Sequence, residues 1–260
     1  MKRILAGNWK MNLLLAEGRS LFEEVAQGCG ARAGITCVVF PPSTLLASLA
    51  AARRENDPRL GVQNFHFETK GAFTGEISAE QARDAGAQYA LVGHSERRRL
   101  FCENDLMARQ KLLAAWRVGL TPVLCVGETL AERERRETRD VLSRQLRRAL
   151  EGAPSKAPLW IAYEPVWAIG TGVVASVEEV AESHEWAREE LIAAGRNAGG
   201  ETVPILYGGS VDPRNAGPLA ATPGVDGFLV GGASLQAAPF LEIARLLEGA
   251  SGTARVDGSP

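Results

Sequence analysis

Glu164 is a single carboxylate between an apolar run and a glycine-containing segment, in the sequence YEPVWAIGTG of residues 163–172. Trp167 and Ile169 follow it closely. A carboxylate enclosed by such side chains loses its hydration, which suits it to proton abstraction. The alternative is a strand-end glutamate in a surface ion pair. The apolar neighbours favour the first interpretation, so we take Glu164 as a candidate general base.

His94 is a second group that could move a proton. It begins the sequence HSER, which predicts a turn of helix, and the free N–H groups and dipole of a helix start disfavour positive charge on a neighbouring imidazole. A neutral imidazole can donate a hydrogen bond to a carbonyl group and take a proton back. The alternative is a histidine that only caps a core strand. His66 and His184 lack this setting, and we interpret them as structural or solvated.

Glycine pairs and one lysine indicate an anionic ligand. The sequences YGGS (207–210) and LVGGAS (229–234) offer backbone N–H groups that an anion can approach closely, because the glycines carry no side chains. Tight turns without a ligand are the alternative. Lys10, near Asn8 at the end of the first apolar run, would neutralise an anionic substrate and stabilise an oxyanion. The expected ligand is a small phosphorylated molecule.

These groups are far apart in the chain, so the elements that carry them must converge. Eight short apolar runs alternate with segments of helical pattern, and they end near Asn8, Pro41, Asn64, Gly93, Val126, Glu164, Gly208 and Val230. The alternation and its mean step of about 32 residues predict parallel strands in a single-domain (β/α)8 barrel of the α/β class, whose active site lies at the carboxyl ends of the strands. An open doubly wound sheet is the alternative, but the first strand lacks its glycine-rich phosphate turn.

Helix start signals support this alternation. Ser176 with Glu179, and Ser78 with Gln81, fit capping boxes. The sequence LAERERRETRDVLSRQLRRALEG, residues 130–152, predicts one helix with a solvated charged face that stops at Gly152. We assign residues 1–250 to the barrel and expect residues 251–260, SGTARVDGSP, to form a frayed polar tail.

Composition excludes several other classes of protein. The 260 residues are 45% hydrophobic and 23% charged, with a net charge of −2 that favours neither nucleic acid nor an anionic membrane as partner. No apolar run approaches the ~18 residues of a transmembrane span, and MKRILAGNWK lacks a signal-length apolar region, so we predict a cytoplasmic protein. The scattered cysteines and histidines predict reduced thiols and no structural metal.

Seven segments resemble the triosephosphate isomerase family: AGNWKMN, GAFTGE, VGHSERR, LCVGE, AYEPVWAIGTG, YGGSV and GFLVGGASL. They follow the family's order from residue 6 to residue 235, and YEPVWAIGTG alone is highly specific. The resemblance implies a TIM barrel that interconverts dihydroxyacetone phosphate and D-glyceraldehyde 3-phosphate through an enediolate, in glycolysis and gluconeogenesis, without cofactor or metal.

Two other functions stay open beside this one. Another sugar-phosphate barrel enzyme, of aldolase or decarboxylase type, is the first. A Schiff-base aldolase would want a lysine deep in the barrel, where the sixth strand instead ends with Glu164. The second is a non-enzymatic phosphate-binding barrel, which we would expect to lack the base, the histidine or the glycines after Glu164.

Carried over residue by residue, the resemblance implies roles for the groups already singled out. Glu164 becomes the catalytic base and His94 the electrophile. Lys10 supplies positive charge, and Asn8 forms hydrogen bonds near the reacting oxygens. The backbone N–H groups implied to hold the phosphate are those of Gly170, Ser210, Gly231 and Gly232.

The resemblance also implies supporting residues. Glu96 is a partner of the site in the HSE motif, and Cys125 lies beneath the base. Ile169 and Leu229 would close over Glu164 from opposite sides. Residues 165–172, here called the lid segment, would close as an apolar cover that excludes water; the notable members are Pro165, Trp167 and Gly172.

The third loop, NFHFETKGAFTGE at residues 64–76, resembles the family's dimer loop. Thr74 near its tip would then reach into a partner subunit beside Asn8 and Lys10. A mobile surface loop is the alternative, but three phenylalanines would then expose unusual apolar area. We therefore predict a homodimer.

Overall fold

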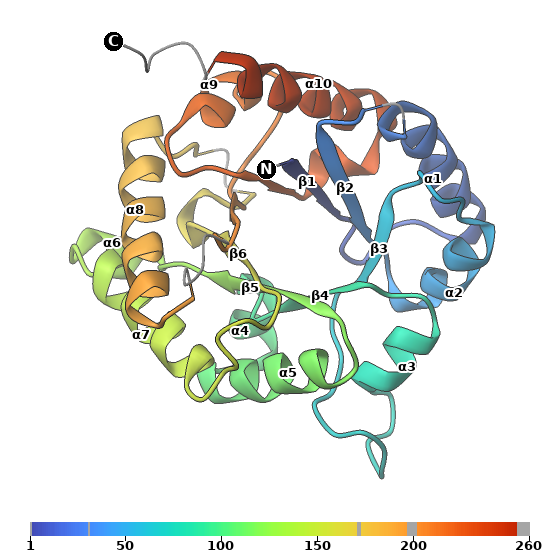
Figure 1. Cartoon of the computed structure of the whole chain (residues 1–260), viewed down its shortest axis with the longest axis horizontal. Helices are drawn as coiled ribbons and strands as arrows, with labels where there is room; N and C mark the ends of the chain where they lie inside the picture. The colour runs from blue at the N-terminus through green and yellow to red at the C-terminus, as the bar shows by residue number, and fades with distance from the viewer. Residues whose placement is uncertain (1, 31, 171–172, 197–201, 254–260) are drawn as a thin grey trace.

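Every apolar run predicted as a strand is one in the computed structural model, which describes residues 2–30, 32–170, 173–196 and 202–253 (Figure 1). The strands are β1 (Arg3–Asn8), β2 (Ile35–Phe40), β3 (Arg59–Val62), β4 (Tyr89–Val92), β5 (Thr121–Val126), β6 (Trp160–Tyr163), β7 (Ile205–Tyr207) and β8 (Gly227–Val230). Each pairs in parallel with the next, and β8 pairs with β1, so the sheet closes. The predicted single-domain (β/α)8 barrel is confirmed.

Side chains that alternate along the strands divide the apolar core into two layers. Ile4 and Ala6 on β1 face the barrel interior, whereas Leu5 between them belongs to the layer under the helices. The interior is filled by aromatic as well as aliphatic groups. The ring of fully buried Phe40 crosses to β3, where a Cβ on Gly61 would lie only 2.2 Å from it. The barrel is therefore a packed core and not a channel.

Helices form the outer ring in Figure 1. They are α1 (Leu15–Cys29), α2 (Ser43–Ala52), α3 (Ala79–Asp84), α4 (Ser95–Phe101), α5 (Asp105–Arg117), α6 (Leu130–Glu134), α7 (Thr138–Leu150), α8 (Val177–Ala193), α9 (Ala216–Ala221) and α10 (Ala237–Thr253). Two short 3-10 turns, η1 (Val166–Ala168) and η2 (Gly232–Leu235), follow β6 and β8. Both predicted capping boxes form, at the starts of α8 and α3.

The prediction of one helix over residues 130–152 is wrong, because the chain forms α6 and α7 there. Arg136 lies between them with φ +59°, in the left-handed region that ends a helix. The ten residues from 131 to 140 contain no large apolar side chain that could hold a continuous helix against the barrel. Only α7 buries an apolar face, with Val141, Leu142 and Leu146, whereas Leu130 on α6 stays 55% exposed.

Two other segments singled out in the sequence are the third loop and the C-terminal residues. The third loop projects beyond the ring of helices between β3 and α3 (Figure 1). Helix α10 continues past residue 250 to Thr253, and residues 254–260 of the expected tail lie outside the described residues. Within the part of the chain that is described, no helix is both long and apolar enough to cross a membrane. A cytoplasmic location stays a prediction.

The left-handed residue between α6 and α7 gives a stability test. Arg136→Gly removes backbone strain of ~1 kcal/mol, which roughly offsets the greater freedom of glycine in the unfolded chain. The melting temperature should therefore stay the same or rise slightly. The control, Arg144→Gly in the middle of α7, should lower it by about 2–4 °C, because glycine costs ~1 kcal/mol in a helix interior. Equal losses in the two variants, measured by calorimetry, would contradict the left-handed assignment.

Candidate functional site

One cavity at the carboxyl ends of the strands brings the predicted groups together. Its volume is about 300 Å³. Asn8 ends β1 and Lys10 follows it, while His94 comes after β4 and Glu164 after β6. All four line the cavity, together with the four residues predicted to hold phosphate and the two predicted to cover the base: Gly170, Ser210, Gly231, Gly232, Ile169 and Leu229.

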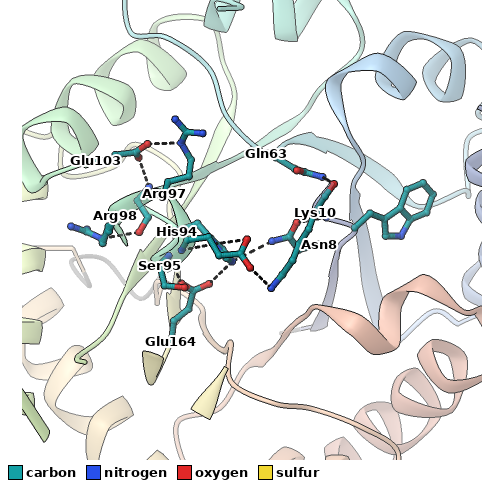
Figure 2. A network of polar contacts seen from close by, with 12 residues as sticks. Asn8, Lys10, Gln63, His94, Ser95, Arg97, Arg98, Glu103 and Glu164 are labelled. Atoms are coloured by element: carbon teal, nitrogen blue, oxygen red, sulfur yellow. Dashed lines mark hydrogen bonds and ion pairs between the residues drawn. The ribbon is translucent and has the colours of Figure 1, made fainter. Parts of the chain in front are cut away.

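Glu164 is 2% exposed, and its two carboxylate oxygens have different surroundings. Oε2 accepts a hydrogen bond from the backbone N–H of Ser95 at 2.9 Å. Oε1 lies 3.1 Å from Nε2 of His94, but this contact is not aligned as a hydrogen bond, and no other described group donates to Oε1 (Figure 2). Gly208 makes room for the side chain, since a Cβ there would lie 2.9 Å from Cγ of Glu164. One oxygen is thus anchored and the other is left able to accept a proton.

His94 is the N-cap of α4, and the hydrogen bond at its Nδ1 indicates its tautomer. Nδ1 accepts a hydrogen bond from the backbone N–H of Glu96 at 3.2 Å. Because an amide N–H can only donate, Nδ1 carries no proton, and the neutral ring carries its proton on Nε2. Nε2 lies 3.3 Å from Nδ2 of Asn8 (Figure 2). Because both groups are donors in this tautomer, the two are in contact without a hydrogen bond, and Nε2 faces the cavity beside Glu164. The ring therefore presents an N–H donor to the cavity.

Lys10 is held in an unusual backbone conformation, with φ +52°. Such a conformation costs a side chain other than glycine ~1–2 kcal/mol. Gln63 at the end of β3 stabilises it by donating from Nε2 to the carbonyl oxygens of Lys10 and Phe40, both at 2.9 Å (Figure 2). The side chain reaches Glu96, with Nζ 2.6 Å from Oε1. Although partial burial opposes ionisation, Lys10 holds the pKa of Glu96 below its usual value.

The glycine-rich wall of the cavity has two parts. Gly231 precedes η2 and Gly232 begins it, so the first N–H groups of this turn lack partners within the turn. A Cβ on Gly232 would meet nothing within 4 Å, which shows open space beside it. The N–H of Ser210 was expected to be available for a phosphate, but it donates to the carbonyl of Ala168 at 3.1 Å. The Ser210 hydroxyl donates to the same oxygen. Gly172 lies outside the described residues.

The chain is similar in sequence and in structure to known proteins. A sequence model described as triosephosphate isomerase matches residues 3–247. The chain belongs to the triosephosphate isomerase family. It is 47% identical to the triosephosphate isomerase of Bdellovibrio bacteriovorus, over 94% of this chain and 99% of that protein, and 48% identical to that of Xanthobacter flavus, over 93% and 96%. The crystal structure of triosephosphate isomerase from Bartonella henselae superposes with a TM-score of 0.85 at 39% identity, covering 95% of this chain and 99% of that one.

Several residues that the triosephosphate isomerase resemblance implied lie behind or beside the cavity wall. Cys125 on β5 is fully buried, and burial together with the negative charge of Glu164 raises the pKa of its thiol. Thr74 is exposed in the third loop. Pro165 precedes η1, and Trp167 lies within it. Nε1 of Trp167 donates a hydrogen bond to the carboxylate of Glu128 at 2.7 Å.

Glu128 is one of the site's supports that sequence reasoning missed. It is fully buried, accepts a hydrogen bond from the hydroxyl of Tyr163 at 3.2 Å, and its carbonyl accepts the N–H of Val166 at 3.0 Å. Burial raises the pKa of this carboxyl. It therefore ties the start of the lid segment to the barrel. The signal was present in the family-like sequence LCVGE, whose glutamate follows the fifth strand.

Glu103 is a second support that was missed, and it lies behind His94. Its carboxylate accepts from Nε of Arg97 at 2.7 Å (Figure 2). It also accepts from the N–H of Gly93 at 2.8 Å and from the ammonium of Lys111. Lys111 also donates to Oδ1 of Asn64 at 2.7 Å. Although burial opposes ionisation, the charge of Lys111 and these donors hold the pKa of Glu103 below its usual value. No local sequence pattern distinguishes Glu103, because its partners lie on separate segments.

His66 and His184, which the sequence led us to interpret as structural or solvated, both make contacts within the fold. His184 on α8 is 1% exposed, its Nδ1 lies 3.0 Å from the carbonyl oxygen of Gly224, and burial lowers its pKa to about 4. His66 stacks on Phe67 and Phe73 in the third loop, with ring centroids 4.3 Å and 4.1 Å apart. Among the described residues, no group of three or more His, Cys, Asp or Glu side chains is arranged to hold a metal.

The buried pair of Glu103 and Lys111 predicts that a conservative substitution of Glu103 lowers stability strongly. Glu103→Gln removes one charge and leaves the buried ammonium of Lys111 without its counter-ion, which should lower the free energy of unfolding by about 3–5 kcal/mol. Glu242→Gln is the matched control, since Glu242 pairs with Arg245 at 2.6 Å on the surface and its loss should change stability little. Chemical denaturation compares the two, and a small effect of Glu103→Gln would show that burial does not make this pair important.

Proposed function

We propose that the chain interconverts dihydroxyacetone phosphate and D-glyceraldehyde 3-phosphate. The observation that most directly supports this is the pair formed by Oε1 of Glu164 and Nε2 of His94, 3.1 Å apart on the cavity wall. A proton acceptor and a neutral N–H donor side by side suit the two carbons and two oxygens of a hydroxycarbonyl compound. The glycines of η2 and the loop after β7 suit the phosphate at the other end of the substrate.

The proposed reaction moves one proton between neighbouring carbons. Oε1 of Glu164 takes a proton from the carbon next to the carbonyl, and the electron pair moves onto the carbonyl oxygen to give an enediolate. The Nε2–H group of His94 donates to that oxygen, and Lys10 stabilises its negative charge. His94 gives its Nε2 proton to the former carbonyl oxygen and takes the hydroxyl proton from the neighbouring oxygen, where the new carbonyl forms. Glu164 then returns the first proton to the other carbon. The combination of a carboxylate base with a neutral histidine is the established description of this family's reaction.

The lid segment has a second proposed role, which is to keep water away from the enediolate. In water an enediolate can expel the neighbouring phosphate, and a closed apolar cover prevents this; loop closure of this kind is established for the family. Two bonds couple the segment to the phosphate site. The Ser210 N–H and hydroxyl hold Ala168, so a phosphate can accept the Ser210 N–H only after Ala168 moves away. Phosphate binding would thus favour movement of the segment.

A Schiff-base aldolase is less well supported by the same cavity. Lys10 is the one lysine among the described residues that line it, and its ammonium is paired with Glu96 at 2.6 Å. A lysine nucleophile must have its nitrogen free to attack a carbonyl, whereas Nζ of Lys10 is engaged with a carboxylate.

We also propose that two copies associate through the third loop. A second cavity, of about 490 Å³, lies next to the first and shares Asn8, Lys10 and His94 with it. Apolar groups beside it are exposed to an extent that favours a partner: Met11 is 95% exposed and Phe101 is 61% exposed. The stacked rings of the third loop give its tip a defined shape that suits insertion there. A partner's loop would cover these groups and support Lys10.

The proposed base predicts the effect of its conservative variant. Glu164→Gln keeps the shape and the bond to Ser95 but cannot accept the substrate proton, so kcat should fall about 10²–10⁴-fold or more. Affinity for inorganic phosphate as a competitive inhibitor should change less than about threefold, because the phosphate site is separate. The test is a coupled assay with glyceraldehyde 3-phosphate. Near-normal turnover would rule out Glu164 as the base.

The proposed shielding role predicts a change of product. Replacing residues 169–172 by a short Gly-Ser link removes the apolar cover but leaves the base in place. A larger share of triose phosphate should then be lost as methylglyoxal and inorganic phosphate, because water and open solvent reach the enediolate. Product partitioning is measured by trapping methylglyoxal, and an unchanged ratio in a variant with lower kcat would contradict the shielding role.

The proposed dimer predicts that a new charge at Phe101 weakens dimer formation, whereas the same charge at Leu130 does not. Phe101→Glu places a carboxylate in the covered cavity at a cost of ~2 kcal/mol or more, so the dimer dissociation constant should rise at least about 30-fold. Leu130→Glu, on an exposed side chain of α6, is the control and should leave it unchanged. Analytical ultracentrifugation measures both. Wild-type protein sedimenting as a single chain at micromolar concentration would refute the dimer itself.

A further inference from the structure

Two cysteines meet between the barrel and the helices, at the end of the strands away from the proposed catalytic cavity. Cys29 is the last residue of α1, and Cys37 lies in the first half of β2, opposite Leu5 of β1. Both belong to the apolar layer under the helices, and each thiol is close enough to the other to shift its pKa. They are 6% and 8% exposed. The fold thus places two thiols from separate elements in one cluster and on one cavity wall.

A second observation shows how a reagent would reach them. Both cysteines line a cavity of about 360 Å³ on this side of the molecule. Its charged lining is mainly basic, with Lys2, Arg32, Arg53 and Arg59 against Glu55 and Asp57. Arg32 also forms an ion pair with Glu248 at 2.9 Å. The excess of positive charge favours a small molecule that carries carboxylates.

The two thiols have unequal chemistry. The hydrogen bond from Cys37, with help from the positive charge of Arg32, lowers the pKa of Cys29 despite its burial. The same hydrogen bond, together with burial, raises the pKa of Cys37. The thiolate is the form that attacks a disulfide. Cys29 is therefore the thiol that attacks first, and Cys37 is the resolving thiol that attacks in the second step.

We propose that Cys29 and Cys37 are a dithiol modification site that a small carboxylate-bearing disulfide oxidises reversibly. The Cys29 thiolate attacks one sulfur of that disulfide, whose sulfur–sulfur bond breaks and releases one thiolate. Cys37 then loses its proton and attacks the sulfur of Cys29, which releases the second thiolate. Two protein thiols become one disulfide, and one small disulfide becomes two thiols. A reducing thiol pool reverses both steps.

The sequence makes the product easy to identify. Trypsin cleaves after Arg32, so Cys29 lies in the peptide 20–32 and Cys37 in the peptide 33–53. Folded, reduced protein is incubated with oxidised glutathione, blocked with N-ethylmaleimide and digested without reductant. The expected product is the two peptides joined, with a mass lower by two hydrogen atoms than their sum. Dithiothreitol before blocking should abolish it.

Two variants test the order of the steps, with thermal unfolding as the check that each is folded. Cys37→Ser should stop at a mixed disulfide between Cys29 and glutathione, while Cys29→Ser should leave Cys37 without glutathione. Exposed Cys102 serves as the internal control for active reagent. The proposal is overturned if Cys102 carries glutathione while peptides 20–32 and 33–53 appear separately with both thiols alkylated. It is also overturned if the two variants acquire glutathione equally.

Discussion

The pairing of β8 with β1 is the constraint on which the rest of the structure depends. Ile4 to Gly7 of β1 align with Gly227 to Val230 of β8, and this closes the sheet. Closure brings Lys10, which follows the first strand, next to Gly231, which follows the last, so that a Cβ on Gly231 would lie 3.7 Å from the ammonium. In an open sheet these groups would lie at opposite edges. The charge of Lys10 and the amides of η2 can act on one small molecule only because the barrel is closed.

The buried carboxylates around the cavity differ in how many hydrogen bonds they accept. Glu103 accepts from Gly93, Arg97 and Lys111, and Glu128 accepts from Tyr163 and Trp167, so both are held by several donors. Oε1 of Glu164 has no aligned donor among the described residues. A satisfied carboxylate positions its neighbours, whereas an oxygen with a free lone pair can take a proton. The difference in hydrogen bonding separates the supporting acids from the proposed base more clearly than burial, which all three share.

Sequence reasoning predicted the strands well because burial on both faces leaves an unmistakable apolar run, and parallel pairing then places each run's end on one rim. It failed where the decisive partner is far away in the chain. Gln63 stabilises Lys10 across 53 residues, and Lys111 reaches Asn64 across 47. The break at Arg136 was missed for another reason. Charged residues suit a helix locally, so only the absence of apolar anchors reveals that the helix stops.

The two faces of strand β2 pack against different parts of the molecule. On β2, Cys37 points toward the helices, whereas Phe40 lies in the barrel interior and its carbonyl accepts from Trp9 and Gln63 near Lys10. Three residues along a strand span about 10 Å, and alternation turns neighbouring side chains to opposite faces. A covalent link at Cys37 would tie β2 to the end of α1 without entering the packed interior that supports Lys10. The alternation of side chains along β2 therefore keeps the proposed thiol site on the helix side of the strand, apart from the interior that supports Lys10.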